Sequence, residues 1–434
     1  QYAVHNLGLP GLGFRREQKR VYPNGNTSSH VLGMVDIDNR GIAGIERYID
    51  RAVLGGGEAR TAGRPGPVML SIDLRVQYAL RDELERARGE FKAKAAVGII
   101  MDAYTGELVA MSSLPDFDPN APMNVSDDAR FNRATLGVYE LGSVFKAVTL
   151  AAALDSGKVR IDGRFDATQP IHYARFTISD YHAQRRWLTV PEVFMHSSNI
   201  GTAKIALQLG TEEYRAYLRR FGLLTRPDIE LPEAGEPLVP TRWSELSTIT
   251  VSFGQGIAVT PVQVVAALAA IVNGGVQVKP SVLRHAAPQA GPRLISQQAS
   301  KEMQDLLRLV VTDGTGRKAD VPGYPVMGKT GTAEKAVAGG YARHRLISSF
   351  LGAFPANNPR YVTLIMFDEP QPTKETYGYA TAGWNAAPVT ARVVKRVAPL
   401  LGLQPVGLPP EETMIHEAKL VSYETDSGVP NPGD

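Results

Sequence analysis

The sequence predicts an α+β fold in which helices flank an antiparallel sheet. Residues 95–113 are predicted to form two apolar strands around the turn Tyr104-Thr105-Gly106, and residues 348–367 a second hairpin of the same kind. Helical segments lie between the hairpins, without regular β-α-β alternation. That order favours an antiparallel sheet over a doubly wound parallel one.

Residues 1–65 are predicted to form a partial N-terminal domain. They are rich in Gly, Asn and Arg, and residues 20–50 have the pattern of short strands and turns followed by a short helix. The Gly/Pro-rich stretch Gly55–Pro67 is predicted to be a linker and marks the first domain boundary.

No metal or cofactor is predicted. Asp36 and Asp38 resemble the start of a calcium-binding loop, but Arg40 and Arg47 stand where acidic ligands are required. The chain contains no Cys, which excludes a disulfide scaffold, a cysteine nucleophile and a Cys-ligated metal. The absence of Cys also fits an oxidising compartment such as the periplasm.

Residues 66–403 are predicted to form the main domain. Asp73 caps a helix with one apolar face, made of Val76, Leu80, Leu84 and Ala87. A long apolar helix is expected over residues 141–157, and the capping box Thr189-Val190-Pro191-Glu192 opens another helix. Residues 404–434 are rich in Pro, Glu and Gly and are expected to be a mobile tail.

The bulk composition is that of a large globular protein. With 434 residues, 43% of them hydrophobic and 21% charged, the chain is too long for one ordinary core. A net charge of +3 gives no case for a nucleic-acid-binding face. The best candidate for a membrane span, Val264–Val272, has about half of the ~20 apolar residues needed and is predicted to be a buried helix. Because the chain begins at Gln1, an N-terminal anchor is expected to lie outside it.

The segment GYPVMGKTGTAEK, residues 323–335, fits two different kinds of active site. Gly323, Gly328, Lys329 and Thr330 match the spacing of the phosphate loop of ATPases and GTPases. That loop needs a buried strand before it and a helix after it. Here the preceding residues are polar and interrupted by Pro, and the following residues contain too many glycines for a helix. The nucleotide interpretation is therefore disfavoured.

The second interpretation is an acyl-transfer site, because Lys329-Thr330-Gly331 also occurs on active-site strands. The chain has no G-x-S-x-G elbow, but Ser143 and Lys146 lie three apart at the start of the predicted helix. This spacing puts them on one helix face, where the amine can reach the hydroxyl, and the helix N-terminus stabilises negative charge on the serine. Lys146 can act as a base only when neutral, which requires burial or a second cation such as Lys329.

Ser197-Ser198-Asn199 supplies a third element between the end of one predicted helix and the start of the next. Taken alone, it could be a turn with Asn199 as a helix cap. Taken alone, Ser143 and Lys146 could likewise be a helix cap and a solvated lysine. Together with Lys329-Thr330-Gly331, the three elements form an ordered set that is hard to obtain by accident.

With these motifs the sequence resembles the penicillin-binding proteins and serine β-lactamases, most closely the class B penicillin-binding proteins of the cell-division type. The resemblance runs from about residue 15 to 400 and includes VGIIMDAYTGELVAMSSLPDFDPN, SSNIGTAKIALQLG, FGQGIAVTPVQ and KTGTAEKAVAGGY. Residues 1–65 would be part of the N-terminal pedestal of that family. Leu141 is a departure, since relatives usually carry Pro before this Gly-Ser pair.

The resemblance implies a serine D,D-transpeptidase that cross-links peptidoglycan stem peptides at the division septum and is a covalent target of β-lactams. Ser143 would attack the carbonyl between two terminal D-alanines, and Lys146 would take its proton. Ser197 and Lys329 would relay a proton to the departing D-alanine. Asn199 would hold both the substrate amide and Lys146.

Substrate binding is expected along the strand that carries Lys329. The resemblance implies that Thr330, Gly331 and Thr332 bind the terminal carboxylate of the substrate beside this lysine. The backbone amides of Ser143 and Thr332 would form the oxyanion hole.

The resemblance also implies a location and partners. The protein would act at the periplasmic face of the cytoplasmic membrane, with a membrane-embedded glycan polymerase and other division proteins as partners and no nucleic acid. Ser198, where side-wall relatives tend to carry Cys, favours the septal type. A D,D-carboxypeptidase and a lactam sensor without turnover remain alternatives, and the N-terminal region argues against a β-lactamase.

Overall fold

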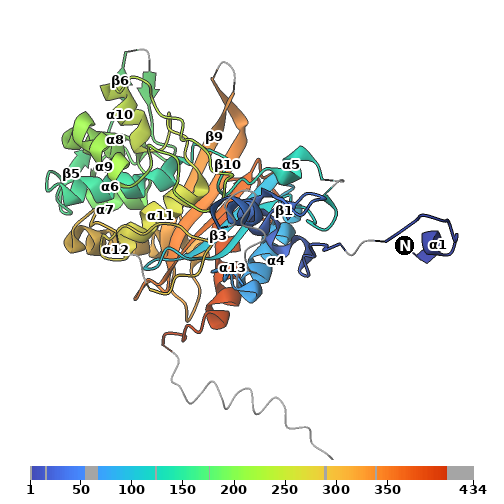
Figure 1. The fold of residues 1–434 in the computed structure, drawn as a ribbon. Coiled ribbons are helices and arrows are strands. Elements are labelled where there is room, and N and C mark those ends of the chain that lie inside the picture. Colours follow the sequence, from blue (N-terminus) through green and yellow to red (C-terminus); the bar gives the residue numbers. More distant parts are fainter. Residues whose placement is uncertain are drawn as a thin grey trace, which may run out of the picture.

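A five-stranded antiparallel sheet forms the centre of the protein, as the sequence predicts (Figure 1). The computed structural model of the chain describes residues 2–14, 17–53, 67–122, 125–174, 176–287, 291–337 and 340–407. The strand order is β4-β3-β11-β10-β9, and every neighbouring pair is antiparallel. These strands are β3 (Ala95–Asp102), β4 (Leu108–Leu114), β9 (Met327–Val337), β10 (Gly340–Phe354) and β11 (Tyr361–Asp368).

Both predicted hairpins are present, as the pairs β3–β4 and β10–β11. Every residue of β3 is buried, so both faces of the sheet are covered. Because successive side chains of a strand point to opposite faces, Val97 and Ile99 belong to one hydrophobic core and Ala96 and Ile100 to a second.

Two long helices, α4 (Leu74–Glu90) and α13 (Ala386–Leu400), cover one face of the sheet (Figure 1). Asp73 caps α4 as predicted, by accepting a hydrogen bond from the Arg75 backbone N–H at 2.9 Å. Gly98 of β3 allows α4 to pack closely, because an added Cβ would lie 2.7 Å from Leu80 Cδ1.

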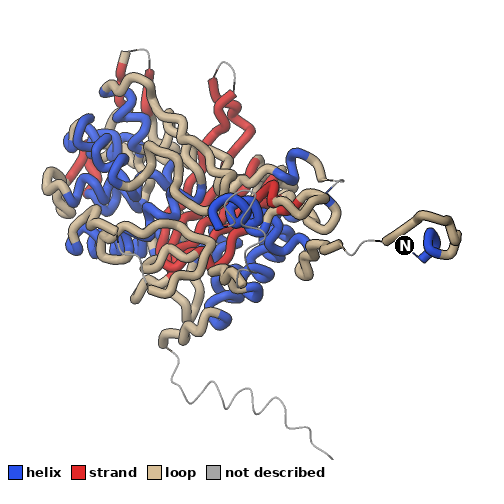
Figure 2. The backbone as a smooth tube through the Cα atoms, viewed as in Figure 1, coloured by secondary structure: helices blue, strands red, loops and turns tan. Residues whose placement is uncertain are grey.

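A group of helices covers the other face, so that helices lie on two sides of the strands (Figure 2). The predicted capping box at Thr189 is present and opens α7, and a second capping box, at Thr260, opens α11. The predicted buried helix is α11, whose side chains are almost all buried. The helices of this layer are α6 (Lys146–Asp155), α7 (Val190–Met195), α8 (Asn199–Leu209), α9 (Thr211–Arg220), α10 (Glu245–Ser252), α11 (Pro261–Val272) and α12 (Gln297–Thr312).

The helix predicted over residues 141–157 has two parts. Gly142–Phe145 form a 3₁₀ turn, η5, and α6 continues from Lys146 to Asp155. The apolar pattern predicts one continuous helix here and carries no signal of the 3₁₀ turn. Gly142 begins it with a φ of 58°, outside the α-helical region.

The remaining elements are short. The strands, turn and short helix expected within residues 20–50 correspond to β1, β2 and α3. The short elements are α1 (Tyr2–His5), η1 (Gly25–Ser28), α2 (Ser29–Leu32), β1 (Met34–Val35), β2 (Gly41–Ala43), α3 (Gly44–Tyr48), η2 (Ile49–Val53), α5 (Asp127–Arg130), β5 (Arg164–Asp166), β6 (Ile171–Tyr173), β7 (Phe176–Ile178), β8 (Trp187–Thr189) and η6 (Arg317–Ala319).

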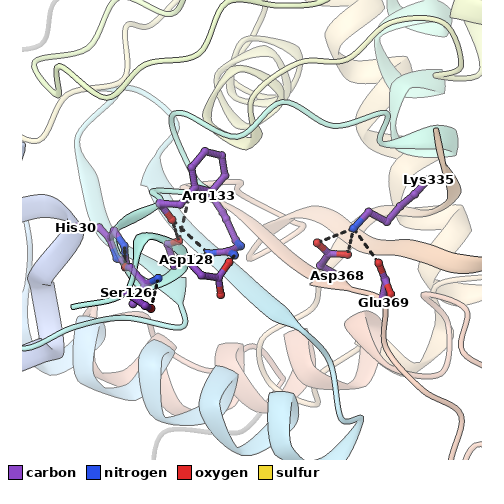
Figure 3. A network of polar contacts seen from close by, with 10 residues as sticks. His30, Ser126, Asp128, Arg133, Lys335, Asp368 and Glu369 are labelled. Atoms are coloured by element: carbon purple, nitrogen blue, oxygen red, sulfur yellow. Dashed lines mark hydrogen bonds and ion pairs between the residues drawn. The ribbon is translucent and has the colours of Figure 1, made fainter. Parts of the chain in front are cut away.

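The N-terminal residues pack against the segment that follows β4. His30 of α2 places its Nε2 2.9 Å from the carbonyl of Ala129 (Figure 3). Burial lowers the pKa of this histidine to about 4, so at neutral pH the ring is uncharged and donates to that carbonyl. The backbone N–H of Tyr22 donates to Asn120 Oδ1 at 2.9 Å.

Ion pairs join the C-terminal part of β9 to the C-terminal end of β11, as Figure 3 shows. Lys335 Nζ lies 2.8 Å from Asp368 Oδ1 and 3.1 Å from Glu369 Oε1. Because β10 lies between these strands in the sheet, the contacts cross it and tie the three strands together.

Two predicted segments fall outside the described residues: the linker, apart from Pro67, and residues 408–434 of the tail. The domain boundaries at 65 and 403 therefore stay predictions. The tail residue Val406 donates its backbone N–H to the carbonyl of Gly323 at 2.7 Å. Among the described helices, none combines the length and apolar character required to cross a membrane.

Candidate active site

The turn η5 carries Ser143 against the middle of β9. An added Cβ on Gly142 would lie 2.9 Å from the carbonyl oxygen of Thr332, and one on Gly331 would lie 2.5 Å from the carbonyl oxygen of Leu141. The two backbones therefore meet at distances that only glycine permits. This contact fixes the half-buried Ser143 beside the strand that carries Lys329.

A second close approach holds η5 from the other side. Gly254, in the loop after α10, has a φ of 82°, and an added Cβ would lie 2.2 Å from the carbonyl oxygen of Gly142. The sequence analysis used this loop only as part of the segment FGQGIAVTPVQ. The signal that points to it is the Gly-x-Gly spacing, which predicts positive-φ backbone.

Lys146 opens α6, and its side chain is fully buried. Its Nζ donates to Ser197 O at 2.6 Å, to Ser197 Oγ at 3.1 Å and to Asn199 Oδ1 at 2.8 Å. The Ser143 side chain forms no hydrogen bond with any described residue. The structure therefore brings Lys146, Ser197 and Asn199 together, with Ser143 one turn before the lysine.

The electrostatics of Lys146 agree with the requirement for a neutral amine. Burial lowers its pKa well below the ordinary value, the nearby charge of Lys329 lowers it further, and Asp180 opposes both. Burial also lowers the pKa of Lys329, to about 7. The shift of Lys146 has the two causes expected from the sequence, burial and a second cation, whereas the shift of Lys329 was not predicted.

Ser197 lies between the two lysines. Its Oγ accepts from Lys146 Nζ at 3.1 Å and from Lys329 Nζ at 2.9 Å. Its φ of 58° is unusual for a residue with a side chain and stores backbone strain. The strained turn therefore presents one hydroxyl to two amines.

Asp180 fixes the turn that contains Ser197. Its Oδ2 accepts from Ser198 Oγ at 2.7 Å, and its Oδ1 accepts from the Ile200 backbone N–H at 2.9 Å. No sequence pattern pointed to Asp180, because the stretch TISDYHAQRR carries no motif. The cap of α8 is Ser198, which accepts from the Gly201 N–H, and not Asn199, the helix cap considered from the sequence.

Residues 329–332 lie within β9, the edge strand of the sheet. A phosphate loop would require these residues to join a strand to a helix, so the nucleotide interpretation is excluded by the fold. Thr330 Oγ1 lies 2.6 Å from Thr315 Oγ1, and Thr332 Oγ1 accepts from the Ala382 N–H at 3.1 Å. The free edge of β9 can pair with an extended peptide.

No metal-binding cluster is found: within the described ranges, no three His, Cys, Asp or Glu side chains are arranged to hold an ion. The chemical groups at the site are two buried amines, hydroxyls and backbone N–H groups. They suit acyl transfer through a serine ester.

The fold is that of a transpeptidase domain, and the site holds the hydroxyls and buried amines that acyl transfer uses. The family model of the penicillin binding protein transpeptidase domain matches residues 96–395. The chain belongs to this family of penicillin-binding transpeptidases.

Two curated relatives match this chain over most of its length. The probable peptidoglycan D,D-transpeptidase FtsI of Caulobacter vibrioides is 42% identical over 414 residues, which cover 93% of this chain and 69% of the relative. The peptidoglycan D,D-transpeptidase FtsI of Escherichia coli K12 is 30% identical, over 93% of this chain and 71% of that protein.

Solved structures of the family have the same fold. Penicillin-binding protein 3 from Mycobacterium tuberculosis in complex with ampicillin superposes with a TM-score of 0.80 at 29% identity, over 90% of this chain and 91% of that one. The transpeptidase domain of penicillin-binding protein 3 from Burkholderia pseudomallei gives a TM-score of 0.70 at 31% identity, over 80% of this chain and 100% of that one.

Proposed function

We propose that this chain is a septal peptidoglycan D,D-transpeptidase that acts through an acyl-enzyme on Ser143 and is acylated there by β-lactams. The observation that carries the proposal is the pair of contacts to Ser197 Oγ, 3.1 Å from Lys146 Nζ and 2.9 Å from Lys329 Nζ. These contacts give a short path for a proton from Lys146, the proposed base, through Ser197 to Lys329 on β9.

In the first step, neutral Lys146 takes the proton of the Ser143 hydroxyl. The serine oxygen attacks the carbonyl carbon between the two terminal D-alanines, and the tetrahedral oxyanion accepts from the backbone N–H groups of Ser143 and Thr332. Burial of Lys146 supports this role, because it lowers the pKa of the amine and so favours its neutral form.

In the second step, the bond between carbonyl carbon and amide nitrogen breaks. The proton passes from Lys146 through Ser197, with Lys329 as its partner, to the nitrogen of the departing D-alanine. An amine of a second stem peptide then attacks the ester carbonyl, and Ser143 regains a proton from that amine. Asn199 is proposed to hold Lys146 and the substrate amide.

Substrate binding is assigned to residues 329–332, near the start of β9. The Lys329 amine and the hydroxyls of Thr330 and Thr332 would hold the terminal carboxylate, while the backbone of Gly331 lies beside the stem peptide. The position of β9 at the edge of the sheet supports this assignment, since an extended peptide can extend the sheet there.

The location and partners are part of the proposal. Membership of the cell-division type supports a protein at the periplasmic face of the cytoplasmic membrane, working with a membrane-embedded glycan polymerase and other division proteins. Residues 20–53, which pack on the transpeptidase domain through contacts such as Tyr22–Asn120, are the proposed surface for these partners.

The test is intact mass after incubation with benzylpenicillin. We expect an adduct of one drug mass that maps to Ser143 and is lost in Ser143→Ala, whereas Ser156→Ala, at the far end of α6, keeps it. An adduct that survives in Ser143→Ala would overturn the assignment of the nucleophile. Release of D-alanine from a stem-peptide analogue with an acceptor amine then separates the alternatives. A transpeptidase forms the cross-linked product, a carboxypeptidase forms only the hydrolysed one, and a sensor releases nothing.

A further inference from the structure

Two loops from different parts of the chain contact the two threonines of β9. Thr315, between α12 and η6, shares a hydrogen bond with Thr330 through their Oγ1 atoms, which lie 2.6 Å apart. Ala382, in the loop between β11 and α13, donates its backbone N–H to Thr332 Oγ1 at 3.1 Å. Thr330 and Thr332 are therefore each hydrogen-bonded to one of the two loops.

The contact from Ala382 determines what Thr332 offers to a ligand. A hydroxyl has one proton to donate and two acceptor positions. Since the Ala382 N–H uses an acceptor position, the proton of Thr332 is left to point at a ligand. The backbone of the loop thereby makes Thr332 a donor, as recognition of a carboxylate requires.

The two loops are joined to each other by Lys318 and Trp384. Lys318 Nζ, on η6, lies 3.5 Å from the centroid of the Trp384 ring, within the range of a cation–π contact. Tyr379 stacks on the same indole at 5.6 Å, with an angle of 11° between the rings. Gly383 brings the backbones together, because an added Cβ would lie 3.0 Å from the carbonyl oxygen of Thr315.

The loop that carries Ala382 is also held by Asn385, which follows it in the chain. Asn385 is fully buried, accepts from Ser348 Oγ and donates to the carbonyl of Ala380 at 2.9 Å. Ser348 stands opposite Thr332 in the β9–β10 register. The Ala382 N–H is thus fixed by the sheet on one side and by the Lys318–Trp384 contact on the other.

We propose that Lys318 and Trp384 are positioning residues that set the selectivity of the site for a carboxylate. They do so by holding the two loops that orient the hydroxyls of Thr330 and Thr332. The inference rests on the proposed function, in which these hydroxyls bind the substrate carboxylate. Neither positioning residue needs to contact the substrate.

The test compares acylation of the full chain by benzylpenicillin and by its methyl ester, which lacks the carboxylate charge. The readout is the ratio of the two second-order rate constants. Thr332→Val is expected to lower this acid-to-ester ratio by about tenfold or more, the usual effect of losing a hydrogen bond to a charged group. Trp384→Ala and Lys318→Met are expected to lower the ratio by roughly threefold to tenfold, with the ester rate unchanged.

Three further variants separate a positioning role from a general loss of structure. Lys318→Arg keeps the cation and should keep the ratio. Lys374→Met removes another exposed cation, from the loop between β11 and α13, and should leave the ratio unchanged. In the Thr332→Val background, Trp384→Ala should lower the ratio by less than it does in the wild type, because only the hydroxyl of Thr330 is then left to lose its orientation.

Equal losses of the acid and ester rates would overturn the inference, as would an unchanged ratio in both Trp384→Ala and Lys318→Met. Lys318 is exposed on its short turn, so Lys318→Met decides the matter if the tryptophan variant does not fold. An unchanged ratio in Thr332→Val would refute the carboxylate role of Thr332 and the inference with it. The acyl-enzyme on Ser143 would stand independently, since its own test is the adduct lost in Ser143→Ala.

Discussion

Lys329 donates a hydrogen bond to Ser197 Oγ at 2.9 Å, although the two residues are 132 positions apart in the chain. The contact joins the edge strand of the sheet to the turn between two helices of the opposing layer. Both amines that reach Ser197 are fully buried, so the site keeps two potential cations close together in a medium that disfavours charge. The pKa shifts of these lysines follow from that arrangement and lead to the first prediction.

The carboxylate selectivity of acylation is expected to fall as pH rises through about 7. Burial lowers the pKa of Lys329 to about 7, so the amine is charged below this pH and neutral above it. Only the charged form attracts a carboxylate. The measurement is the acid-to-ester ratio for benzylpenicillin and its methyl ester from about pH 5 to pH 9.

Lys329→Gln is the control for this pH dependence. It removes the titrating group and should give a low ratio that does not vary with pH. A wild-type ratio that increases with pH would contradict the assigned role of Lys329.

Asp180→Asn is expected to slow acylation by about tenfold or more, because the carboxylate holds both Ser198 Oγ and the Ile200 N–H. The charge of Asp180 raises the pKa of Lys146 against the effect of burial. Its removal should lower that pKa further and move the acidic limb of the rate profile to lower pH. The acylation rate measured as a function of pH reports both effects.

Asp162→Asn is the matched control, because Asp162 lies on the surface and pairs only with the exposed Arg160 among the described residues. It should leave the rate and the profile unchanged. A profile that shifts equally in both variants would mean that general charge, rather than the local contact, acts on Lys146.

Gly254→Ala is expected to destabilise the protein by about 2 kcal/mol or more and to reduce acylation of the molecules that remain folded. The added methyl group would lie 2.2 Å from the carbonyl oxygen of Gly142, and the backbone has a φ of 82°. The turn that carries Ser143 must move to make room. Chemical denaturation and the acylation rate measure the two effects.

Gly157→Ala separates backbone strain from the displaced turn. Gly157 also has a positive φ, of 70°, but no atom lies within 4 Å of an added Cβ. This variant should lose about 1 kcal/mol of stability and keep its acylation rate. Loss of acylation in both variants alike would contradict the importance of the Gly254–Gly142 contact.

Glu83→Ala is expected to lower the free energy of unfolding by about 2 kcal/mol. The carboxylate of Glu83 is almost fully buried on α4 and meets Arg392 and Arg396 of α13 at 3.2 and 2.7 Å. Its loss removes the buried carboxylate that the two arginines share and leaves Arg392 paired with Glu90 and Arg396 paired with Asp82. The measurement is urea denaturation.

Glu90→Ala serves for comparison, since Glu90 is exposed and bonds Arg392 at 3.1 Å. An exposed ion pair contributes about 0.5 kcal/mol, so this variant should unfold close to the wild type. Equal effects of the two substitutions would contradict the role given to burial.

The hairpins, helix caps and motif residues were predictable because their signals are local. Continuous apolar runs bounded by turn residues mark β3 and β11, and Thr189 and Thr260 carry their capping partners three positions later. Lys146, Ser197, Asn199 and Lys329 were grouped correctly, because they occur in short motifs of fixed spacing.

The supporting residues were not predictable in this way. Asp180, Thr315 and Ala382 act through partners that are distant in the sequence, and no local pattern distinguishes them from surface residues. The 3₁₀ turn at Ser143 was missed for a related reason. It arises where Gly142, with positive φ, meets β9, and helix propensity does not report such a contact.

The turn that carries Ser143 is held by contacts between backbone carbonyl groups and glycines, and not by side chains that a mutation could alter slightly. Substituting Gly142, Gly254 or Gly331 would collide with backbone, so these positions offer no gradual route to a slower reaction with an antibiotic. Slower reaction with a covalent inhibitor is therefore expected to arise first from substitutions of the side chains that hold the site in place, such as Asp180, rather than of the backbone turn around the nucleophile.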